Sequence, residues 1–239
     1  MISESYRPQV LEEVFGHDDA KKSLTTYLNS NTPGQAVLLV GTPGIGKTTI
    51  ALASARTLQY EPLEVNASRT LRSHADVQSL RDSCMAPFSF ASLTKYDIPR
   101  KTCVILDEID GSDPHAQRKI LDWIQDESRR VPILMTANEE PIIFKRAKKH
   151  VLTIRCLPSS ATVLFQHMKP GIPLAEFQTL AKECLHDVRR ILNRMQYGRS
   201  DTLQTCALTG DLFKDLHLQR ETFYKTDPIQ VAIESTCSE

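Results

Sequence analysis

The sequence predicts an α/β fold, an open parallel β-sheet with helices on both faces, followed by a small helical domain. Short apolar segments alternate with helical segments up to about residue 156, whereas an α+β fold would keep strands and helices in separate blocks. Several of the apolar segments are nearly uninterrupted, as in strands that are buried on both faces of a parallel sheet. Beyond Ile154 the strand signal ends, and helical patterns follow.

The composition is typical of a folded protein with one large domain or two small ones. Apolar residues make up 41% of the 239 residues and charged residues 24%, which supplies a core and excludes general disorder. Lys+Arg and Asp+Glu are both 29, so the net charge gives no indication of nucleic-acid binding. The longest apolar runs, about five residues, are far too short to cross a bilayer. The six cysteines lack metal-ligand spacing, which argues against zinc and favours a reducing compartment.

Five segments have the length and composition of short strands. They are residues 36–40, 63–66, 103–106, 131–136 and 151–154. The helices expected around them span residues 18–28, 48–58, 77–85 and 115–124, and the later helices span residues 160–168, 174–184 and 187–197. We therefore expect an α/β domain over residues 1–156, a helical domain over 157–198, and a short helical segment or tail over 199–239.

Residues 41–48 form the most specific motif of the chain. They read Gly-Thr-Pro-Gly-Ile-Gly-Lys-Thr and match the phosphate-binding pattern G-x-x-x-x-G-K-[ST], between a buried strand and a helix. In that context, backbone N–H groups and the helix N-terminus bind phosphate, Lys47 contacts the β- and γ-phosphates, and Thr48 helps to hold Mg²⁺. The alternative is a glycine-rich turn that only joins the strand to the helix. The predicted binding residues are Gly41, Thr42, Pro43, Gly44, Ile45, Gly46, Lys47, Thr48 and Thr49.

Polar residues also follow two later strands. Asp107 and Glu108 end the strand at residues 103–106, at the sheet edge where ligands bind in open α/β folds. Asp107 suits a Mg²⁺ ligand and Glu108 a base that orients the attacking water, although both acids could simply begin a turn. Asn138 follows the next strand and is a candidate contact for the γ-phosphate, while an asparagine in such a place often only forms a turn.

These motifs together resemble the AAA+ ATPases, and within that group the clamp-loader subunits of the replication factor C family. Residues 6–8 (Tyr-Arg-Pro) with residues 14–17 (Val-Phe-Gly-His) resemble the opening segment of those subunits. Residues 64–68 (Glu-Val-Asn-Ala-Ser) and residues 187–193 (Asp-Val-Arg-Arg-Ile-Leu-Asn) resemble two further family motifs. The resemblance covers about residues 5 to 198 and implies an AAA+ P-loop domain with a five-stranded parallel sheet and a helical lid.

The resemblance also implies roles for individual residues. The adenine pocket would be lined by the opening segment, Asn138 would be the residue called sensor 1, and Arg189 the lid arginine called sensor 2. The adenine-pocket residues would be Tyr6, Arg7, Pro8, Val14 and Phe15. The catalytic residues would be Lys47, Glu108, Asn138 and Arg189, with Asn138 and Arg189 also contacting the nucleotide, and with Thr48 and Asp107 holding Mg²⁺.

Two features resemble the large subunit of that family more than the small subunits. Residues 107–111 (Asp-Glu-Ile-Asp-Gly) are similar to the large-subunit form of the acidic motif. Small subunits carry a Ser-Arg-Cys triplet that supplies an arginine to the neighbouring ATP. Here residues 145–150 read Lys-Arg-Ala-Lys-Lys-His, and Lys149, nearest to that arginine, lacks the fork of a guanidinium. Arg69 stands where the family usually has aspartate, and we have no mechanistic account of that reversal.

The resemblance implies an ATP-dependent clamp-loader subunit of the large type that helps to load a sliding clamp onto primer–template DNA. It implies ATP and Mg²⁺ as cofactors, weak ATP hydrolysis by the isolated chain, other clamp-loader subunits in a pentamer-like hetero-oligomer, and an intracellular location at the site of DNA replication, with no membrane. The stretch over 199–239 is expected to be too short for the complete helical collar of the family. Two alternatives remain: another AAA+ ATPase of replication or recombination, such as a helicase loader or branch-migration motor, or a nucleotide-binding assembly subunit with little hydrolysis.

Contacts with DNA are the least specific expectation. Arg81, Lys119 and the basic residues of 145–149 are candidates for binding phosphates, but isolated basic residues are usually only solvated.

Overall fold

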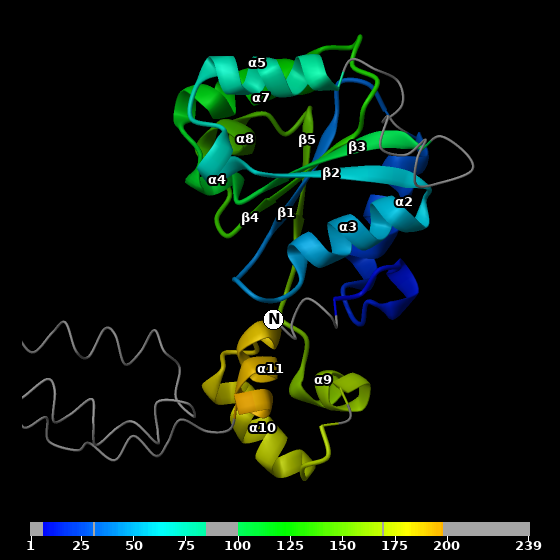
Figure 1. Cartoon of the computed structure of the whole chain (residues 1–239), viewed down its shortest axis with the longest axis vertical. Helices are drawn as coiled ribbons and strands as arrows, with labels where there is room; N and C mark the ends of the chain where they lie inside the picture. The colour runs from blue at the N-terminus through cyan, green and yellow to red at the C-terminus, as the bar shows by residue number, and fades with distance from the viewer. Residues whose placement is uncertain (1–6, 31, 85–99, 169, 198–239) are drawn as a thin grey trace, which may run out of the picture. The chain divides into compact units, whose positions relative to one another are not determined.

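The structure is a computed structural model, which describes residues 7–30, 32–84, 100–168 and 170–197 (Figure 1). The chain divides into two compact units, the first ending at Val188 and the second beginning at Arg189. Each unit is described by itself. Tyr6 and the stretch over 199–239, for which expectations were stated above, lie outside the described residues.

The first unit contains a five-stranded sheet in the order β2-β3-β4-β1-β5. Its strands are β1 (Ala36–Val40), β2 (Tyr60–Asn66), β3 (Lys101–Asp107), β4 (Ile133–Ala137) and β5 (Val151–Arg155). Every pair of neighbours is parallel, which confirms the predicted fold class. Because all strands run in one direction, the residues that follow β1, β3 and β4 meet at one edge of the sheet. Strand β4 lies between β1 and β3. Asn138, which follows β4, is therefore placed between the phosphate-binding loop that follows β1 and the acids that follow β3.

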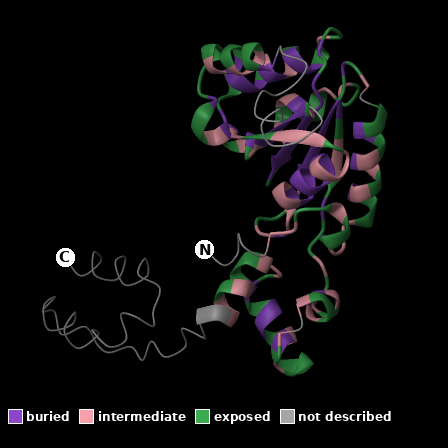
Figure 2. Cartoon of the chain, turned by 45° about the vertical axis from the view of Figure 1, so that its right-hand side comes forward, coloured by how far each residue is buried: buried purple, intermediate pink, exposed green. Residues whose placement is uncertain are grey.

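Helices cover the two faces of the sheet (Figure 1). Leu38 packs into a core cluster on the α7 side, whereas its neighbour Leu39 packs into the cluster on the side of α2 and α3. This alternation explains why β1 is a continuous apolar run, and Figure 2 shows the central strands of the sheet as largely buried. The helical elements are η1 (Leu11–Glu13), α2 (Asp18–Ser30), α3 (Lys47–Thr57), α4 (Ala67–Thr70), α5 (His74–Ser83), η2 (Ile109–Gly111), α7 (Pro114–Gln125) and α8 (Ile142–Arg146).

Two boundaries differ from the sequence expectation by three residues, for local reasons. Strand β2 begins at Tyr60 rather than at residue 63, because it is an edge strand whose polar residues obscure the apolar pattern. Helix α5 begins at His74 rather than at residue 77, because Ser73 and Asp76 form a capping box that starts the helix earlier. The predicted C-terminal residue of that helix, Met85, lies outside the described residues.

Short elements escaped the sequence prediction altogether. Helix α4 has four residues and α8 has five, so neither is long enough to display a helical repeat of apolar positions. Helix α4 is started by Asn66, whose side-chain oxygen accepts a hydrogen bond from the Arg69 backbone N–H at 3.1 Å. This short helix directly follows β2, and it therefore brings Ser68 to the carboxyl edge of the sheet.

The opposite edge of the sheet is closed by a buried polar network. The Tyr27 hydroxyl donates to the Gln35 carbonyl at 2.9 Å and accepts from the Ile133 backbone N–H at 3.1 Å. The buried Arg129 guanidinium donates to the carbonyls of Gln35 and Val131. These contacts join α2 to the segments that enter β1 and β4, and they satisfy backbone groups at the start of the sheet.

Three further helices follow β5: α9 (Ala161–Met168), α10 (Leu174–Glu183) and α11 (Val188–Tyr197). Phe165 of α9 packs edge-on against Phe177 of α10, with ring centroids 5.6 Å apart. Both of these helices belong to the first compact unit, and the second unit begins within α11. A separate lid domain over 157–198 therefore stays a prediction. Among the described residues, no helix has the length and apolar character that would let it span a membrane.

Candidate functional site

The centre of the candidate site is Lys47, the first residue of α3. Its ammonium donates hydrogen bonds to the carbonyls of Gly41 (2.7 Å) and Thr42 (2.8 Å) and to Asn138 Oδ1 (3.1 Å). The residue as a whole is only 8% exposed, and burial lowers the pKa of Lys47. A buried cation that is bonded only to neutral oxygens is well suited to bind an anion.

The loop before Lys47 depends on glycine at specific positions. Gly44 and Gly46 have φ values of +72° and +100°, in the left-handed region that side chains disfavour. A Cβ on Gly41 would lie 2.4 Å from the Cys156 carbonyl oxygen, and one on Gly44 would lie 1.9 Å from Asp187 Oδ1. The motif therefore requires glycine here both for the backbone conformation and for close packing of the residues that follow β5 and precede α11.

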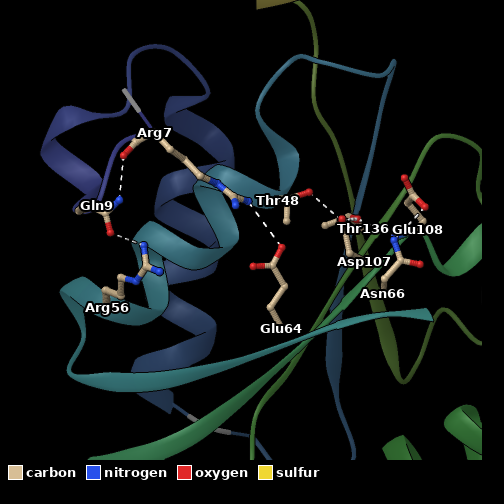
Figure 3. A network of polar contacts seen from close by, with 9 residues as sticks. All are labelled: Arg7, Gln9, Thr48, Arg56, Glu64, Asn66, Asp107, Glu108 and Thr136. Carbon is tan, nitrogen blue, oxygen red and sulfur yellow. Dashed lines mark hydrogen bonds and ion pairs between the residues drawn. The ribbon is translucent and has the colours of Figure 1, made fainter. Parts of the chain in front are cut away.

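A hydroxyl and a carboxylate meet beside this loop. The Thr48 hydroxyl donates to Asp107 Oδ1 at 2.6 Å, and the Thr136 hydroxyl of β4 donates to the same oxygen (Figure 3). Hard oxygen donors of this kind fit Mg²⁺, which binds proteins through one or two carboxylates and completes its shell with waters and phosphates. In the part of the chain that the structure describes, no group of three or more His, Cys, Asp or Glu side chains is placed to hold a metal ion. Thr136 was not among the predicted site residues.

Glu108 adopts an unusual backbone conformation. Its φ of 56° lies in the left-handed region, and its backbone N–H donates to the Thr136 hydroxyl at 3.2 Å. Its carboxylate oxygen Oε2 accepts hydrogen bonds from Asn66 Nδ2 (3.1 Å) and Ser68 Oγ (3.0 Å), and the contact with Asn66 is visible in Figure 3. The carboxylate is thus held by the end of β2 and by α4.

The turn after β4 is fixed by Asp110. Its Oδ2 accepts hydrogen bonds from the backbone N–H groups of Asn138 (3.0 Å) and Glu139 (3.4 Å). Its other oxygen, Oδ1, is buried and has no hydrogen-bond partner among the described residues. The Asp110 carboxylate therefore orients Asn138, whose side chain reaches Lys47.

The opening segment lies beside the loop, and Arg7 in it contacts an edge strand of the sheet. The Arg7 guanidinium pairs with Glu64 of β2 at 3.7 Å (Figure 3). Val14 is buried, and the Phe15 ring stacks on His167 of α9. His17 Nε2 lies 2.9 Å from the Ile45 carbonyl oxygen, which joins the opening segment directly to the phosphate-binding loop.

The structure thus brings together most of the predicted residues. Lys47, Thr48, Asp107, Glu108 and Asn138 gather at the carboxyl edge of the sheet. Pro43 and Ile45 lie in the loop, Thr49 lies on α3, and Pro8 is half-buried in the opening segment. Arg189 is exposed on α11, in the second compact unit.

The comparisons with known proteins agree with this geometry. Residues 37–154 match the model of the ATPase family associated with various cellular activities (AAA). The matched region begins in β1 and ends in β5, so it contains the loop, the acids and Asn138.

Two proteins called replication factor C large subunit are similar in sequence. The protein of Sulfurisphaera tokodaii is 38% identical over 141 residues, which make up 56% of this chain and 30% of that protein. The protein of Methanococcus maripaludis is 30% identical over 217 residues, which make up 81% of this chain and 41% of that protein. The chain therefore spans less than half the length of these curated relatives.

Among solved structures, the Thermotoga maritima RuvB Holliday junction branch migration motor has a similar fold. The TM-score is 0.60 at 18% sequence identity, and the match covers 80% of this chain and 64% of that chain. A single-substitution variant of the same protein gives the same TM-score and identity. At this level of identity the likeness concerns the fold.

Proposed function

We propose that this chain, whose residues 37–154 match the AAA family of ATPases, is an ATP-dependent clamp-loader subunit of the large-subunit type. In this proposal it acts with other clamp-loader subunits to load a sliding clamp onto primer–template DNA, at the intracellular site of DNA replication. The observation that carries the proposal is the convergence of a buried lysine, a hydroxyl–carboxylate pair and a glutamate at one sheet edge. The similarity in sequence to replication factor C large subunits supports the more specific role.

The residues of this site supply the parts that phosphoryl transfer needs. Lys47 would exchange its neutral acceptors for the β- and γ-phosphate oxygens of ATP. Thr48 and Asp107 would hold Mg²⁺, which neutralises charge on the phosphates when it is bound. Glu108 would accept the proton of the attacking water, and Asn138 would help to position the γ-phosphate. Arg189 is proposed to add a further phosphate contact.

Hydrolysis by the isolated chain should be slow, since the proposed site requires an arginine from a neighbouring subunit. Adding partner subunits, clamp and primed DNA should raise the steady-state ATPase rate by roughly 10-fold or more, because a supplied arginine can be worth about 10³–10⁵ in rate. The measurement is phosphate release from the chain alone and from each mixture. Equal turnover in all mixtures would contradict the clamp-loader role.

The contacts of Glu108 predict a restraint on that turnover. Asn66 and Ser68 hold the Glu108 carboxylate, so it must leave these donors, or share its oxygens, to orient a water. Replacing Asn66 with alanine should therefore raise the basal ATPase rate by roughly 2- to 5-fold, the value of one partly exposed hydrogen bond. Ser83→Ala, at the end of α5, is a suitable control, since the hydrogen bonds of the Ser83 hydroxyl among the described residues are to the Leu80 carbonyl of the same helix and to the adjacent Cys84. An unchanged or lower basal rate would mean that the contact does not restrain Glu108.

One alternative is favoured by the same contacts. If the Glu108 carboxylate stays with Asn66 and Ser68 when nucleotide is bound, the chain would bind ATP as an assembly subunit with little hydrolysis. Clamp loading by the whole complex would then survive the loss of the Glu108 carboxylate. A branch-migration role is supported only by similarity of fold to RuvB.

A further inference from the structure

The turn between helices α10 and α11 lies against the phosphate-binding loop. The backbone N–H of Val188, the first residue of α11, donates a hydrogen bond to the Gly44 carbonyl at 3.0 Å. The carboxylate of the preceding residue, Asp187, occupies the position that a Cβ on Gly44 would take. All three residues belong to the first compact unit. An acidic side chain is therefore packed directly on the backbone of the loop.

The backbone that brings Asp187 to this position is unusual. Leu185 and His186 have φ values of 54° and 59°, so two successive residues lie in the left-handed region that side chains disfavour. Backbone hydrogen bonds hold the turn, from His186 N–H to the Ala181 carbonyl at 2.9 Å and from Asp187 N–H to the Cys184 carbonyl at 3.0 Å. His186 Nδ1 is buried and has no hydrogen-bond partner among the described residues. Such costly conformations are concentrated at ligand sites and switches, so this turn is a candidate for a functional role.

Asp187 adds a negative charge beside a loop that is proposed to receive another anion. Burial lowers the pKa of Lys47, whereas Cys156 and the carboxylates of Asp110, Asp107 and Asp187 raise it. Two of these carboxylates already have a place in the site. Asp107 accepts hydrogen bonds from two hydroxyls, and Asp110 accepts them from backbone N–H groups after β4. Asp187 differs from both because its carboxylate lies on the backbone of the phosphate-binding loop itself.

We infer that Asp187 limits the affinity of the loop for polyphosphates, because its carboxylate opposes the phosphates of ATP and thereby favours release of the nucleotide. The inference rests on the proposed ATP site and assigns that site a residue that weakens binding. Like charges repel strongly at short distance, and Asp187 is half-buried, so salt screens its charge only in part. Lys47 attracts the phosphates from within the loop, and Asp187 keeps that attraction from holding the nucleotide too long.

The test removes the charge of Asp187 and keeps the shape of the side chain. Titration calorimetry with ATP and with inorganic tripolyphosphate, both with Mg²⁺, is performed on the full chain and on Asp187→Asn. The variant should bind both ligands roughly 3- to 10-fold more tightly, because one like charge near the phosphates is lost. The dissociation rate of ATP should fall by a similar factor. The gain in affinity should shrink as the salt concentration rises, because salt screens the charge that the substitution removes.

A second variant and a control separate the charge from the fold. Asp187→Ser also removes the charge and keeps a residue that can begin a helix, so it should show the same gain as Asp187→Asn. Asp82→Asn is the same change at an exposed position of α5 and should bind both ligands like the unmodified chain.

The outcomes distinguish this inference from the proposed function. Unchanged or weaker binding by both Asp187 variants would overturn the role of Asp187 while leaving the phosphate site intact. A gain that is limited to ATP, or that does not depend on salt, would also overturn it, since the repulsion must act on phosphates. Failure of the unmodified chain and of both variants to bind either ligand would overturn the proposed ATP site and this inference together.

Discussion

Replacing Lys47 with methionine should weaken ATP binding by roughly 30- to several-thousand-fold, the effect of removing one partner from a desolvated charged contact worth about 2–5 kcal/mol. Lys47 is buried, and among the residues that the structure describes its ammonium is bonded only to neutral oxygens. Phosphate oxygens would give this cation a charged partner, so most of its electrostatic interaction is made only when nucleotide is present. The measurement is ATP affinity by titration calorimetry.

The same substitution should change the stability of the fold much less. Burial lowers the pKa of Lys47, which means that the protein disfavours its charged form, and methionine removes that cost. Three oxygen acceptors lose their donor in the variant, and this loss opposes the stability gained by removing the buried charge. Thermal unfolding of the variant checks that the loop remains folded. Lys22→Met, on the exposed face of α2, is the matched control, and affinity that is lost equally in both variants would argue against a specific role for Lys47.

The parts of this site that the sequence predicted are those that a local pattern specifies. Glycine spacing, a lysine and a threonine define the loop at residues 41–48, because they must occupy fixed positions between one strand and one helix. Asp107 and Glu108 were found for a similar reason, since they end a buried apolar run. In each case, the chemistry and the strand that positions it are adjacent in the sequence.

The parts that the sequence did not predict depend on pairing between distant segments. Strand β2 pairs with β3 so that Asn66 lies opposite Asp107, which brings its amide to Glu108, 42 positions along the chain. Thr136 reaches Asp107 in the same way from β4. A polar residue at the end of an edge strand is a weak signal by itself, and it becomes informative only when the strand order is known. The stack of Phe15 on His167 likewise joins segments with no shared pattern.

The requirement for glycine at position 111, outside the phosphate-binding loop, is explained only by the structure. A Cβ on Gly111 would lie 2.8 Å from Ser68 Cβ, so the acidic motif needs glycine where α4 packs against η2. This close approach also holds Ser68 within reach of Glu108. The last position of the motif at residues 107–111, which resembles the large-subunit form, is thus tied to the positioning of the proposed base.

Replacing Glu108 with glutamine should lower the maximal ATPase rate of the assembled complex by roughly 10²- to 10⁴-fold, the usual contribution of a general base. Glutamine keeps a side-chain oxygen that can accept the hydrogen bonds of Asn66 and Ser68, so the left-handed turn at this position should persist. It cannot take the proton of a water molecule. ATP affinity should therefore stay within about 3-fold of the unmodified chain, because Lys47 and Thr48 supply the phosphate contacts.

The informative comparison is with Asp113→Asn, another carboxylate-to-amide change in a loop that follows β3. Asp113 caps α7 through the His115 backbone N–H, and asparagine caps a helix equally well, so this variant should hydrolyse ATP like the unmodified chain. A large loss of turnover with retained ATP binding in the Glu108 variant alone would identify Glu108 as the base. Unchanged turnover in both variants would mean that this carboxylate takes no part in hydrolysis. If the complex with the Glu108 variant hydrolyses little ATP but still loads clamps, the chain acts through nucleotide binding. Glu108 would then keep its hydrogen bond to Asn66 while the complex works, and that bond would not restrain hydrolysis.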